Sequence, residues 1–303
     1  MQVTVAKTAG FCFGVRRALE LTQKSAALSP TCTLGELIHN RQVVEELAGQ
    51  GVAVIERPED APAGTAVVIR SHGVGPQVYD TLRAQGSPVI DATCPFVKRI
   101  HQIAAEVPEN GLLLLAGRRE HPEVQGILGY CRGPALVFSS AEEMQELLAF
   151  LPSDGNIPVI LAAQTTFSLR EWEKILFFAK KVCTNLKVFD TICRATIERQ
   201  SEAKQLAQSA DAIVVVGGLH SANTTALAAL CGSYCPTVQV ETADQLERHR
   251  EALRGARFIG ITAGASTPAC IIKEVQNSMS VLENNTEEMN FGELLDQYSK
   301  SIH

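Results

Sequence analysis

Three cysteines in this chain are each followed by a histidine at the same distance. The three pairs, each separated by 27 residues, are Cys12 and His39, Cys94 and His121, and Cys193 and His220. Each cysteine follows a short apolar run and precedes a helical pattern, and each histidine stands just before another helical pattern. The spacing therefore predicts one structural unit used three times. Three thiols with nearby imidazoles would suit a metal or cluster site that keeps one position open.

The segments around the cysteines read as strand, polar turn, cysteine and helix, starting at Val3, Ser87 and Lys187. Their apolar runs are short and β-branched, which is typical of strands buried on both faces of a parallel sheet. Further strands end in polar loops that lead into helices. We predict an α/β fold of three βαβα units with parallel sheets, related by a pseudo-threefold axis. Ligands of such sheets bind beyond the carboxyl ends of the strands, where the three cysteines are expected.

The repeat sets the expected domain boundaries. They are an N-terminal strand with Cys12 at 1–13, α/β units at 14–94, 95–191 and 192–282, and a polar C-terminal tail at 283–303.

Composition limits the classes of protein that this chain can belong to. Of its 303 residues, 46% are hydrophobic and 20% charged, which is ordinary for a globular protein. No apolar stretch reaches the roughly 18 residues that span a bilayer, and the start lacks a signal-peptide core, so we expect a cytoplasmic protein without membrane partners. The net charge of −6 argues against nucleic-acid binding but leaves room for a local anion site.

Nine cysteines without a CxxC motif exclude a zinc ribbon or a ferredoxin-type binding run. A lone cysteine at a strand end is most often a small packed residue, but three at equivalent positions favour a shared site. Thiolates suit zinc or an iron–sulfur cluster. The six cysteines outside the pattern are expected to be structural: Cys32, Cys131, Cys183, Cys231, Cys235 and Cys270.

Histidines and one glutamate are further candidates. His72 lies in a Ser-His-Gly loop at a strand end, where a packing role is difficult to see. His39 and His121 each stand 27 residues after one of the repeated cysteines. His101 and His249 are expected on solvated helix faces. Glu123 stands in a first helical turn, where a carboxylate is favoured by the helix dipole. In a closed cleft its pKa would rise, and it could then hold a proton at neutral pH.

Three loops rich in hydroxyl groups, 164–166, 221–224 and 264–268, precede helices. Ser, Thr and Asn are ordinary N-caps at such places. Three such loops at one phase of a repeat would also form a phosphate cradle.

Together these motifs resemble the 4-hydroxy-3-methylbut-2-enyl diphosphate reductases, the LytB family. The resemblance runs through GFCFGVRRAL, HNRQVVEEL, RSHGV, DATCPFV, HPEVQG, QTT, the cysteine of DTICRAT and TAGASTP, in that order. It implies three α/β domains around a central [4Fe-4S] cluster with three cysteine ligands and one open iron, which binds the allylic hydroxyl of the substrate. The implied reaction is reductive dehydroxylation to isopentenyl and dimethylallyl diphosphate, the last step of the non-mevalonate isoprenoid pathway. Ferredoxin or flavodoxin would supply the electrons.

The resemblance also implies residue roles. Cys12, Cys94 and Cys193 match the cluster ligands, and Glu123 matches the proton donor. The residues that match substrate-binding positions are His39, His72 and His121 near the diphosphate, Thr165 at the hydroxyl, and Ser221, Asn223 and Ser266 around the diphosphate.

The sequence departs from the family pattern at three positions. Ala222 follows Ser221 where a second serine is usual, His220 stands where asparagine is expected, and Ala269 follows Pro268 where aspartate is common. These changes concern diphosphate binding, and His220 is therefore not expected to act in the site.

Other functions remain open on the residues alone. An aconitase-like hydro-lyase would use an open iron without net reduction, and an iron–sulfur sensor or electron-transfer protein would not need Glu123 or the hydroxyl loops. A zinc enzyme would be colourless.

Overall fold

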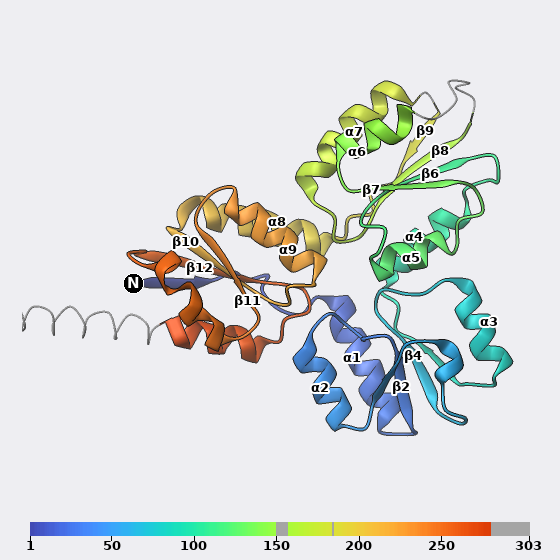
Figure 1. Ribbon diagram of the computed structural model, residues 1–303, viewed down its shortest axis with the longest axis horizontal. Coiled ribbons are helices and arrows are strands. Elements are labelled where there is room, and N and C mark those ends of the chain that lie inside the picture. Colours follow the sequence, from blue (N-terminus) through green and yellow to red (C-terminus); the bar gives the residue numbers. More distant parts are fainter. Residues whose placement is uncertain (150–156, 184, 280–303) are drawn as a thin grey trace, which may run out of the picture. The chain divides into compact units, whose positions relative to one another are not determined.

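The computed structural model describes residues 1–149, 157–183 and 185–279. Its described strands form three four-stranded sheets in which all pairings are parallel (Figure 1). Contacts group the chain into two compact parts. The middle part is Cys12–Glu198, and the terminal part joins Met1–Phe11 to the residues from Arg199 on.

The first sheet of the middle part contains short strands. Its order is β3 (Ala53–Ile55), β2 (Thr31–Leu34), β4 (Ala66–Ile69), β5 (Val89–Asp91). The two central strands, β2 and β4, are wholly buried, whereas β3 is mostly exposed and β5 half-buried. Its helices are α1 (Phe13–Ala26), α2 (Arg41–Gly49), α3 (Pro76–Ala84) and the short 3₁₀ helix η1 (Pro58–Asp60). Burial on both faces explains why a central strand such as β4 reads as a continuous apolar run in the sequence.

The second sheet of the middle part has helices on both faces. Its order is β7 (Ala135–Phe138), β6 (Leu112–Ala116), β8 (Val159–Ala163), β9 (Leu186–Val188). Its helices are α4 (Pro95–Ala105), α5 (Pro122–Leu128), α6 (Ala141–Ala149) and α7 (Leu169–Val182). Leu114 packs in a core with residues of α6 and α7, whereas Leu113 packs with residues of α4 and α5. This period of two places one helical layer on each face of the sheet.

The sheet of the terminal part joins both ends of the sequence. Its order is β1 (Gln2–Val5), β12 (Phe258–Ala263), β10 (Ala212–Val216), β11 (Thr237–Val240). The helices that follow its strands are α9 (Ala222–Gly232), the 3₁₀ helix η2 (Ala243–His249), α10 (Arg250–Leu253) and a helical segment at 269–279, and α8 (Arg194–Ser209) leads into it. Val214 packs with the 269–279 segment on one face, and Val215 packs with α8 and α9 on the other.

The three sheets share one topology, which confirms the predicted class of parallel α/β units. In each, an edge strand leads into a cysteine: β5 into Cys94, β9 into Cys193 and β1 into Cys12. The pseudo-threefold arrangement of the sheets and the five predicted boundaries stay predictions. The predicted tail at 283–303 lies outside the described residues.

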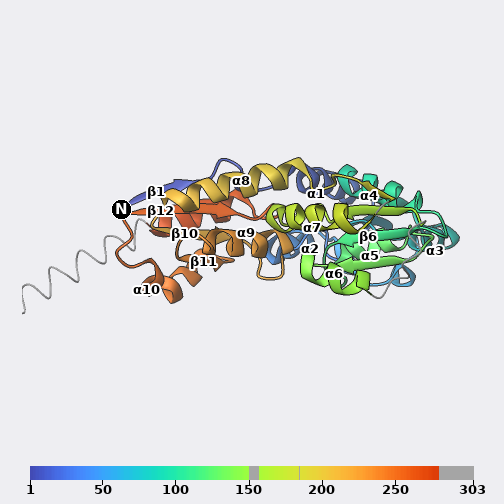
Figure 2. The same ribbon diagram turned by 90° about the horizontal axis from the view of Figure 1, so that it is seen from above.

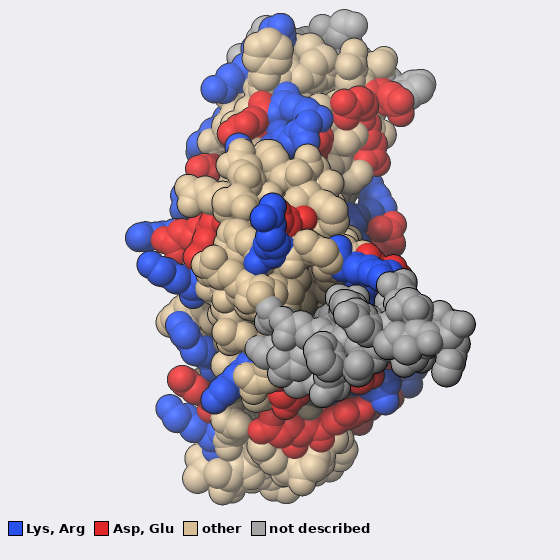
Figure 3. All heavy atoms as spheres, turned by 90° about the vertical axis from the view of Figure 1, so that its left-hand side faces the viewer, with Lys and Arg blue, Asp and Glu red and all other residues tan. Residues whose placement is uncertain are grey.

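Figure 3 shows one face of the molecule, on which Lys and Arg side chains alternate with Asp and Glu among wide uncharged areas. Among the described residues, no helix is both long and apolar enough to cross a membrane.

Candidate functional site

The predicted site residues lie just beyond the carboxyl ends of strands. In the middle part, His39, His72 and Cys94 follow β2, β4 and β5, and His121, Thr165 and Cys193 follow β6, β8 and β9. In the terminal part, Ser221 and Ser266 follow β10 and β12 in the same way, and Cys12, the first residue of the middle part, follows β1. This is the edge at which parallel α/β sheets bind ligands.

The three cysteines stand at the starts of helices. Cys12 and Cys94 are the N-cap residues of α1 and α4, and Cys193 directly precedes α8. None of these three helices has an acidic residue in its first turn. The positive end of a helix dipole favours a thiolate over a thiol, so these positions suit metal ligation.

The thiols lie close to one another in the middle part. A Cβ atom on Gly14 would lie 2.8 Å from Cys94 Sγ and 3.9 Å from Cys12 Sγ. The charge of Cys12 raises the pKa of both Cys94 and Cys193, so these three sulfurs interact electrostatically. Glycine at position 14 therefore lets two cysteine-bearing helix starts approach each other.

Burial is the main influence on the titration of these thiols. It raises the pKa of Cys94 to about 11, against the opposing effect of the backbone N–H groups of Phe96 and Val97. The pKa of Cys193 is raised by burial and lowered by Thr196, whose Oγ1 lies 3.1 Å from Cys193 Sγ. A metal ion that displaces these protons would remove the cost of burying the thiolates. Three thiols from three loops, with the space that Gly14 leaves, fit an iron–sulfur cluster.

Equivalent backbone hydrogen bonds hold two of the cysteine loops. The N–H of Cys94 donates to the carbonyl of Ser71 at 3.0 Å, and the N–H of Cys193 donates to the carbonyl of Thr165 at 3.0 Å. Arg17 of α1 also donates to the carbonyls of Thr93 and Asp91. The loop of each of these cysteines is thus fixed to the loop that carries His72 or Thr165.

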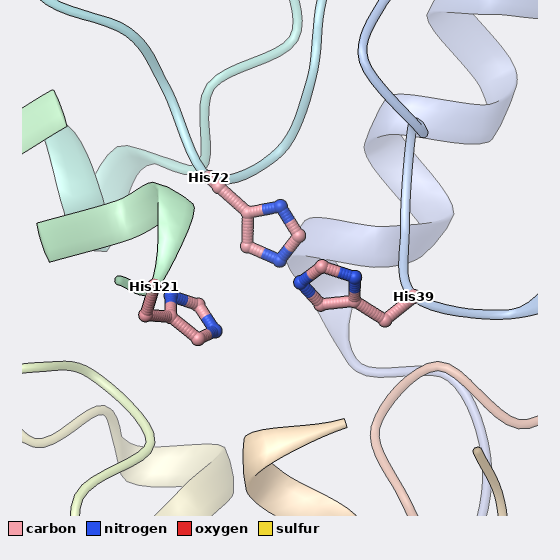
Figure 4. Close-up of side chains that lie close together, drawn as sticks. All are labelled: His39, His72 and His121. Atoms are coloured by element: carbon pink, nitrogen blue, oxygen red, sulfur yellow. The ribbon is translucent and has the colours of Figure 1, made fainter. Parts of the chain in front are cut away.

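His39, His72 and His121 form a cluster in the middle part, with their rings pointing toward one another (Figure 4). The ring centroids of His39 and His72 are 4.5 Å apart, and His121 lies 5.6 and 5.3 Å from them. One ligand atom of each residue lies within 4.8 Å of the others, which makes a metal ion a possible occupant.

The hydrogen bond at His121 favours an anion over a metal in this cluster. The Glu123 N–H donates to His121 Nδ1 at 3.1 Å, so the proton of the neutral imidazole is on Nε2. A metal at Nε2 would have to displace that proton or break the bond to Nδ1. The Nε2–H of His121 is therefore a donor suited to an oxygen atom of a ligand.

The histidines are held neutral. Burial, with smaller effects of the nearby His39, Arg118 and Arg70, lowers the pKa of His121 to about 3. Burial also lowers the pKa of His72 well below its usual value, and that of His39 more moderately. The cationic Arg70 and Arg118 would favour an anionic ligand here, and such a ligand would in turn favour protonated histidine.

Glu123 is the buried acid of the site. It is only 2% exposed, and both of its oxygens accept hydrogen bonds from Thr165, from N–H at 2.7 Å and from Oγ1 at 2.8 Å. Burial nevertheless raises its pKa to about 7. The charge of Glu123 also raises the pKa of Cys193, so the carboxyl group lies near the thiols. A carboxyl group that titrates near neutral pH can donate or accept a proton in a reaction.

The terminal part contains two of the loops rich in hydroxyl groups, 221–224 and 264–268. Ser221 Oγ caps α9 by accepting the N–H of Thr224 at 3.4 Å, as an ordinary N-cap does. Asn223 is buried, and its Nδ2 has no hydrogen-bond partner among the described residues. Ser266 is buried in the next loop of the same sheet. An orphaned amide group in a loop at a helix start is suited to a phosphate oxygen.

The prediction for His101 was wrong. Its side chain is 5% exposed and stacks on Tyr130, with ring centroids 4.4 Å apart. A Cβ on Gly73 would lie 2.6 Å from His101 Cε1, so the imidazole packs against the loop beside His72. This contact comes from a loop of another segment, so the helical pattern around His101 does not reveal it. His220, expected to have no site role, is exposed.

Known proteins resemble this chain over almost its whole length. The sequence profile of the family described as LytB protein matches residues 3–280. The 4-hydroxy-3-methylbut-2-enyl diphosphate reductase of Caldanaerobacter subterraneus subsp. tengcongensis is 40% identical over 297 residues, covering 95% of this chain and 99% of the relative. The reductase of the same name from Geobacter sulfurreducens is 41% identical over 288 residues, covering 94% and 99%.

Solved structures match as well. The structure of (E)-4-hydroxy-3-methyl-but-2-enyl diphosphate reductase, described as the terminal enzyme of the non-mevalonate pathway, has a TM-score of 0.64 and 37% identity, covering 92% of this chain and 99% of that one. The E-1-hydroxy-2-methyl-but-2-enyl-4-diphosphate reductase from Plasmodium falciparum has a TM-score of 0.84 and 26% identity, covering 91% and 87%. The match of profile, sequences and folds shows that this chain belongs to the LytB protein family, a family of iron–sulfur oxidoreductases.

Proposed function

We propose that this chain catalyses the reductive dehydroxylation of 4-hydroxy-3-methylbut-2-enyl diphosphate to isopentenyl and dimethylallyl diphosphate, the last step of the non-mevalonate pathway. The observation that carries this proposal is the buried Glu123 carboxyl group, which has a pKa of about 7, accepts both hydrogen bonds of Thr165 and interacts electrostatically with Cys193. A proton donor next to a redox centre is what the loss of a hydroxyl group as water requires.

The thiols of Cys12, Cys94 and Cys193 would hold a [4Fe-4S] cluster with one iron free of protein ligands. Such a cluster supplies electrons and an electrophilic iron to the reaction when it is bound. The support for this assignment is the soft donor set, the positions of the thiols at helix starts and the space left by Gly14.

The diphosphate would be held by the histidine cluster and by the hydroxyl loops. In the middle part, Nε2–H of His121 donates a hydrogen bond, and His39 and His72 can donate in the same cluster. In the terminal part, Ser221, Asn223 and Ser266 offer hydroxyl and amide groups. Because the diphosphate is remote from the reacting carbon, binding it fixes the geometry of the allylic end.

Thr165 and Glu123 would move the proton to the leaving group. Thr165 Oγ1 now donates to Glu123, but protonated Glu123 can donate to that oxygen instead, and Thr165 can then donate to the substrate hydroxyl. In the balanced reaction, two electrons and two protons break the C–O bond, release water and form one C–H bond. Glu123 supplies one proton, and its raised pKa makes that proton available near pH 7.

The electrons would come from ferredoxin or flavodoxin, as one-electron carriers. The cytoplasmic location expected from the sequence stays a prediction.

Turnover under anaerobic conditions tests this function. Purified holoenzyme, given the substrate and dithionite-reduced methyl viologen, should release both isopentenyl and dimethylallyl diphosphate. A product formed by loss of water without uptake of electrons, as an aconitase-like hydro-lyase would give, or no turnover by iron-loaded protein, would contradict the proposal.

A further inference from the structure

Resting on the function proposed above, we propose that a basic and aromatic surface at the starts of α1, α4 and α8 docks a small acidic electron-transfer protein. This docking surface is defined by two exposed phenylalanines and three exposed arginines: Phe13, Phe96, Arg16, Arg99 and Arg194. All five belong to the middle part.

The aromatic side chains of this surface are exposed directly beside the ligand cysteines. Phe13 follows Cys12 and is 55% exposed, and Phe96, two residues after Cys94, is 44% exposed. Elsewhere in the same helices, apolar residues such as Val15 and Val97 are buried. Exposed aromatic residues that gather in one place are typical of protein interfaces, where they are enriched relative to the rest of the surface.

The charges around the two phenylalanines are mostly positive. Arg16, Arg99 and Arg194 are exposed, and Arg17 and Lys98 lie beside them in the same helical turns. Arg194 pairs with Glu198 and Lys98 with Asp91, each at 2.7 Å, so the positive charge of the surface comes mainly from Arg16, Arg17 and Arg99. Cations near a helix start oppose the helix dipole, which normally selects acidic residues there. Helices α5, α6 and α7 do carry a first-turn glutamate, whereas α1, α4 and α8 carry none. First-turn acids are also absent from α2, α3 and α9, so what distinguishes the starts of α1 and α4 is that exposed arginines stand beside exposed phenylalanine rings.

The helix starts that form the surface converge. Gly14, in the first turn of α1, leaves room for Cys94 Sγ, since a Cβ there would lie 2.8 Å from that sulfur and 3.9 Å from Cys12 Sγ. Figure 2 shows α1 and α4 along the same side of the middle part, while α2, α5 and α6 lie toward the other side. The exposed rings therefore border the region where the cluster ligands meet.

An acidic electron carrier complements the charge of this surface and supplies the electrons that the reaction consumes. The chain has a net charge of −6, so an acidic partner would be repelled on average and needs a local basic patch to dock. Each turnover consumes two electrons. Two one-electron carriers are therefore oxidised for each C–O bond that is cleaved, and the oxygen leaves as water. Docking at this surface would place the carrier at the helix starts that bear the half-buried cysteines.

Comparing two electron sources tests this inference. The double variant Arg16→Glu/Arg99→Glu and the variant Phe96→Ala are assayed as holoenzymes, with either an acidic ferredoxin kept reduced by its reductase and NADPH, or reduced methyl viologen. Lys24→Glu, at the exposed far end of α1, and Phe177→Ala, an exposed ring of α7, are matched controls.

With ferredoxin, both docking variants should raise the KM for the carrier by about tenfold or more, and the charge variant should lose most of its salt dependence. With methyl viologen, kcat should match that of the wild type, and the controls should match it with both donors. Unchanged ferredoxin kinetics would overturn the docking site, and so would an equal loss with both donors at unchanged iron content. Failure of the proposed function is distinguishable, because the wild type would then not turn over with methyl viologen.

Discussion

At the scale of single residues, one short helix start sets the protonation of two site groups. The N–H of Glu123 fixes the proton of His121 on Nε2, and the side chain of Glu123 receives both hydrogen bonds of Thr165. Burial keeps His121 neutral and Glu123 close to half-protonated at neutral pH, because both charged forms lose hydration. The His-Pro-Glu sequence therefore provides a hydrogen-bond donor and an acid from three adjacent positions.

Replacing the acid tests its role. Glu123→Gln should keep the cluster but reduce kcat by at least about 100-fold, the usual size of a general-acid contribution. In the wild type, the proton is present below the pKa of about 7 and lost above it, so kcat should fall as pH rises beyond 7. Steady-state turnover from pH 5.5 to 9 measures both effects, and Glu120→Gln, an exposed neighbour, is the control. Turnover at the wild-type rate by Glu123→Gln would remove Glu123 as the proton donor.

At the scale of secondary-structure elements, the repeated feature is a parallel strand that delivers a cysteine to a helix start. Local sequence predicts this feature well, because the apolar run, the polar turn and the helical period are all contained in about twenty residues. Packing between elements is less visible in the sequence. The helical pattern alone predicts a solvated face for His101, yet α4 packs against the Gly73 loop as well as the second sheet, and the contact with the loop buries the imidazole.

A substitution in the first turn of α1 tests how tightly the cysteines are packed. In Gly14→Ala, the new Cβ would lie 2.8 Å from Cys94 Sγ, closer than real Cβ atoms approach, so either the sulfur or the helix must move. We expect the variant to fold but to bind less than half of the wild-type iron. Gly49→Ala, in α2 with no atom within 4 Å of its Cβ, should bind iron normally. Iron content after anaerobic purification gives the answer, and full iron in Gly14→Ala would contradict this packing argument.

At the scale of the whole molecule, the candidate residues are divided between two compact parts. Cys94, Cys193 and the acid lie in the middle part, of which Cys12 is the first residue. The loops with Ser221 and Ser266 lie in the terminal part. The terminal sheet itself combines β1 with strands from the other end of the chain. This division separates the residues that would hold the cluster from part of the set that would hold the diphosphate.

This division predicts that iron binding and substrate binding can be impaired independently of each other. The wild type, purified anaerobically, should be brown with about four irons per chain. Cys94→Ser should lose most of this iron, with the exposed Cys270→Ser as control.

Ser221→Ala should keep the iron and raise the KM for the substrate about tenfold, because it removes only a hydroxyl of the terminal part. Iron analysis and substrate kinetics decide the matter; colourless, zinc-loaded wild type would contradict the cluster, and loss of iron in Ser221→Ala would contradict the separation.

The sequence by itself determined the class of fold and the edge at which the site residues stand. The patterns that predict these features are local: the apolar runs of strands, the helical periods, the polar loops and the 27-residue spacing. In parallel α/β units they place Cys94, His121 and Thr165 beyond strand ends. Only the tertiary structure decided which of these groups meet and how they titrate. The clustering of His39 with His72 and His121, the pKa of Glu123 and the burial of His101 depend on loss of water at contacts between distant segments. Desolvation of this kind depends on how segments from different parts of the chain pack around a side chain, and no short stretch of sequence specifies it.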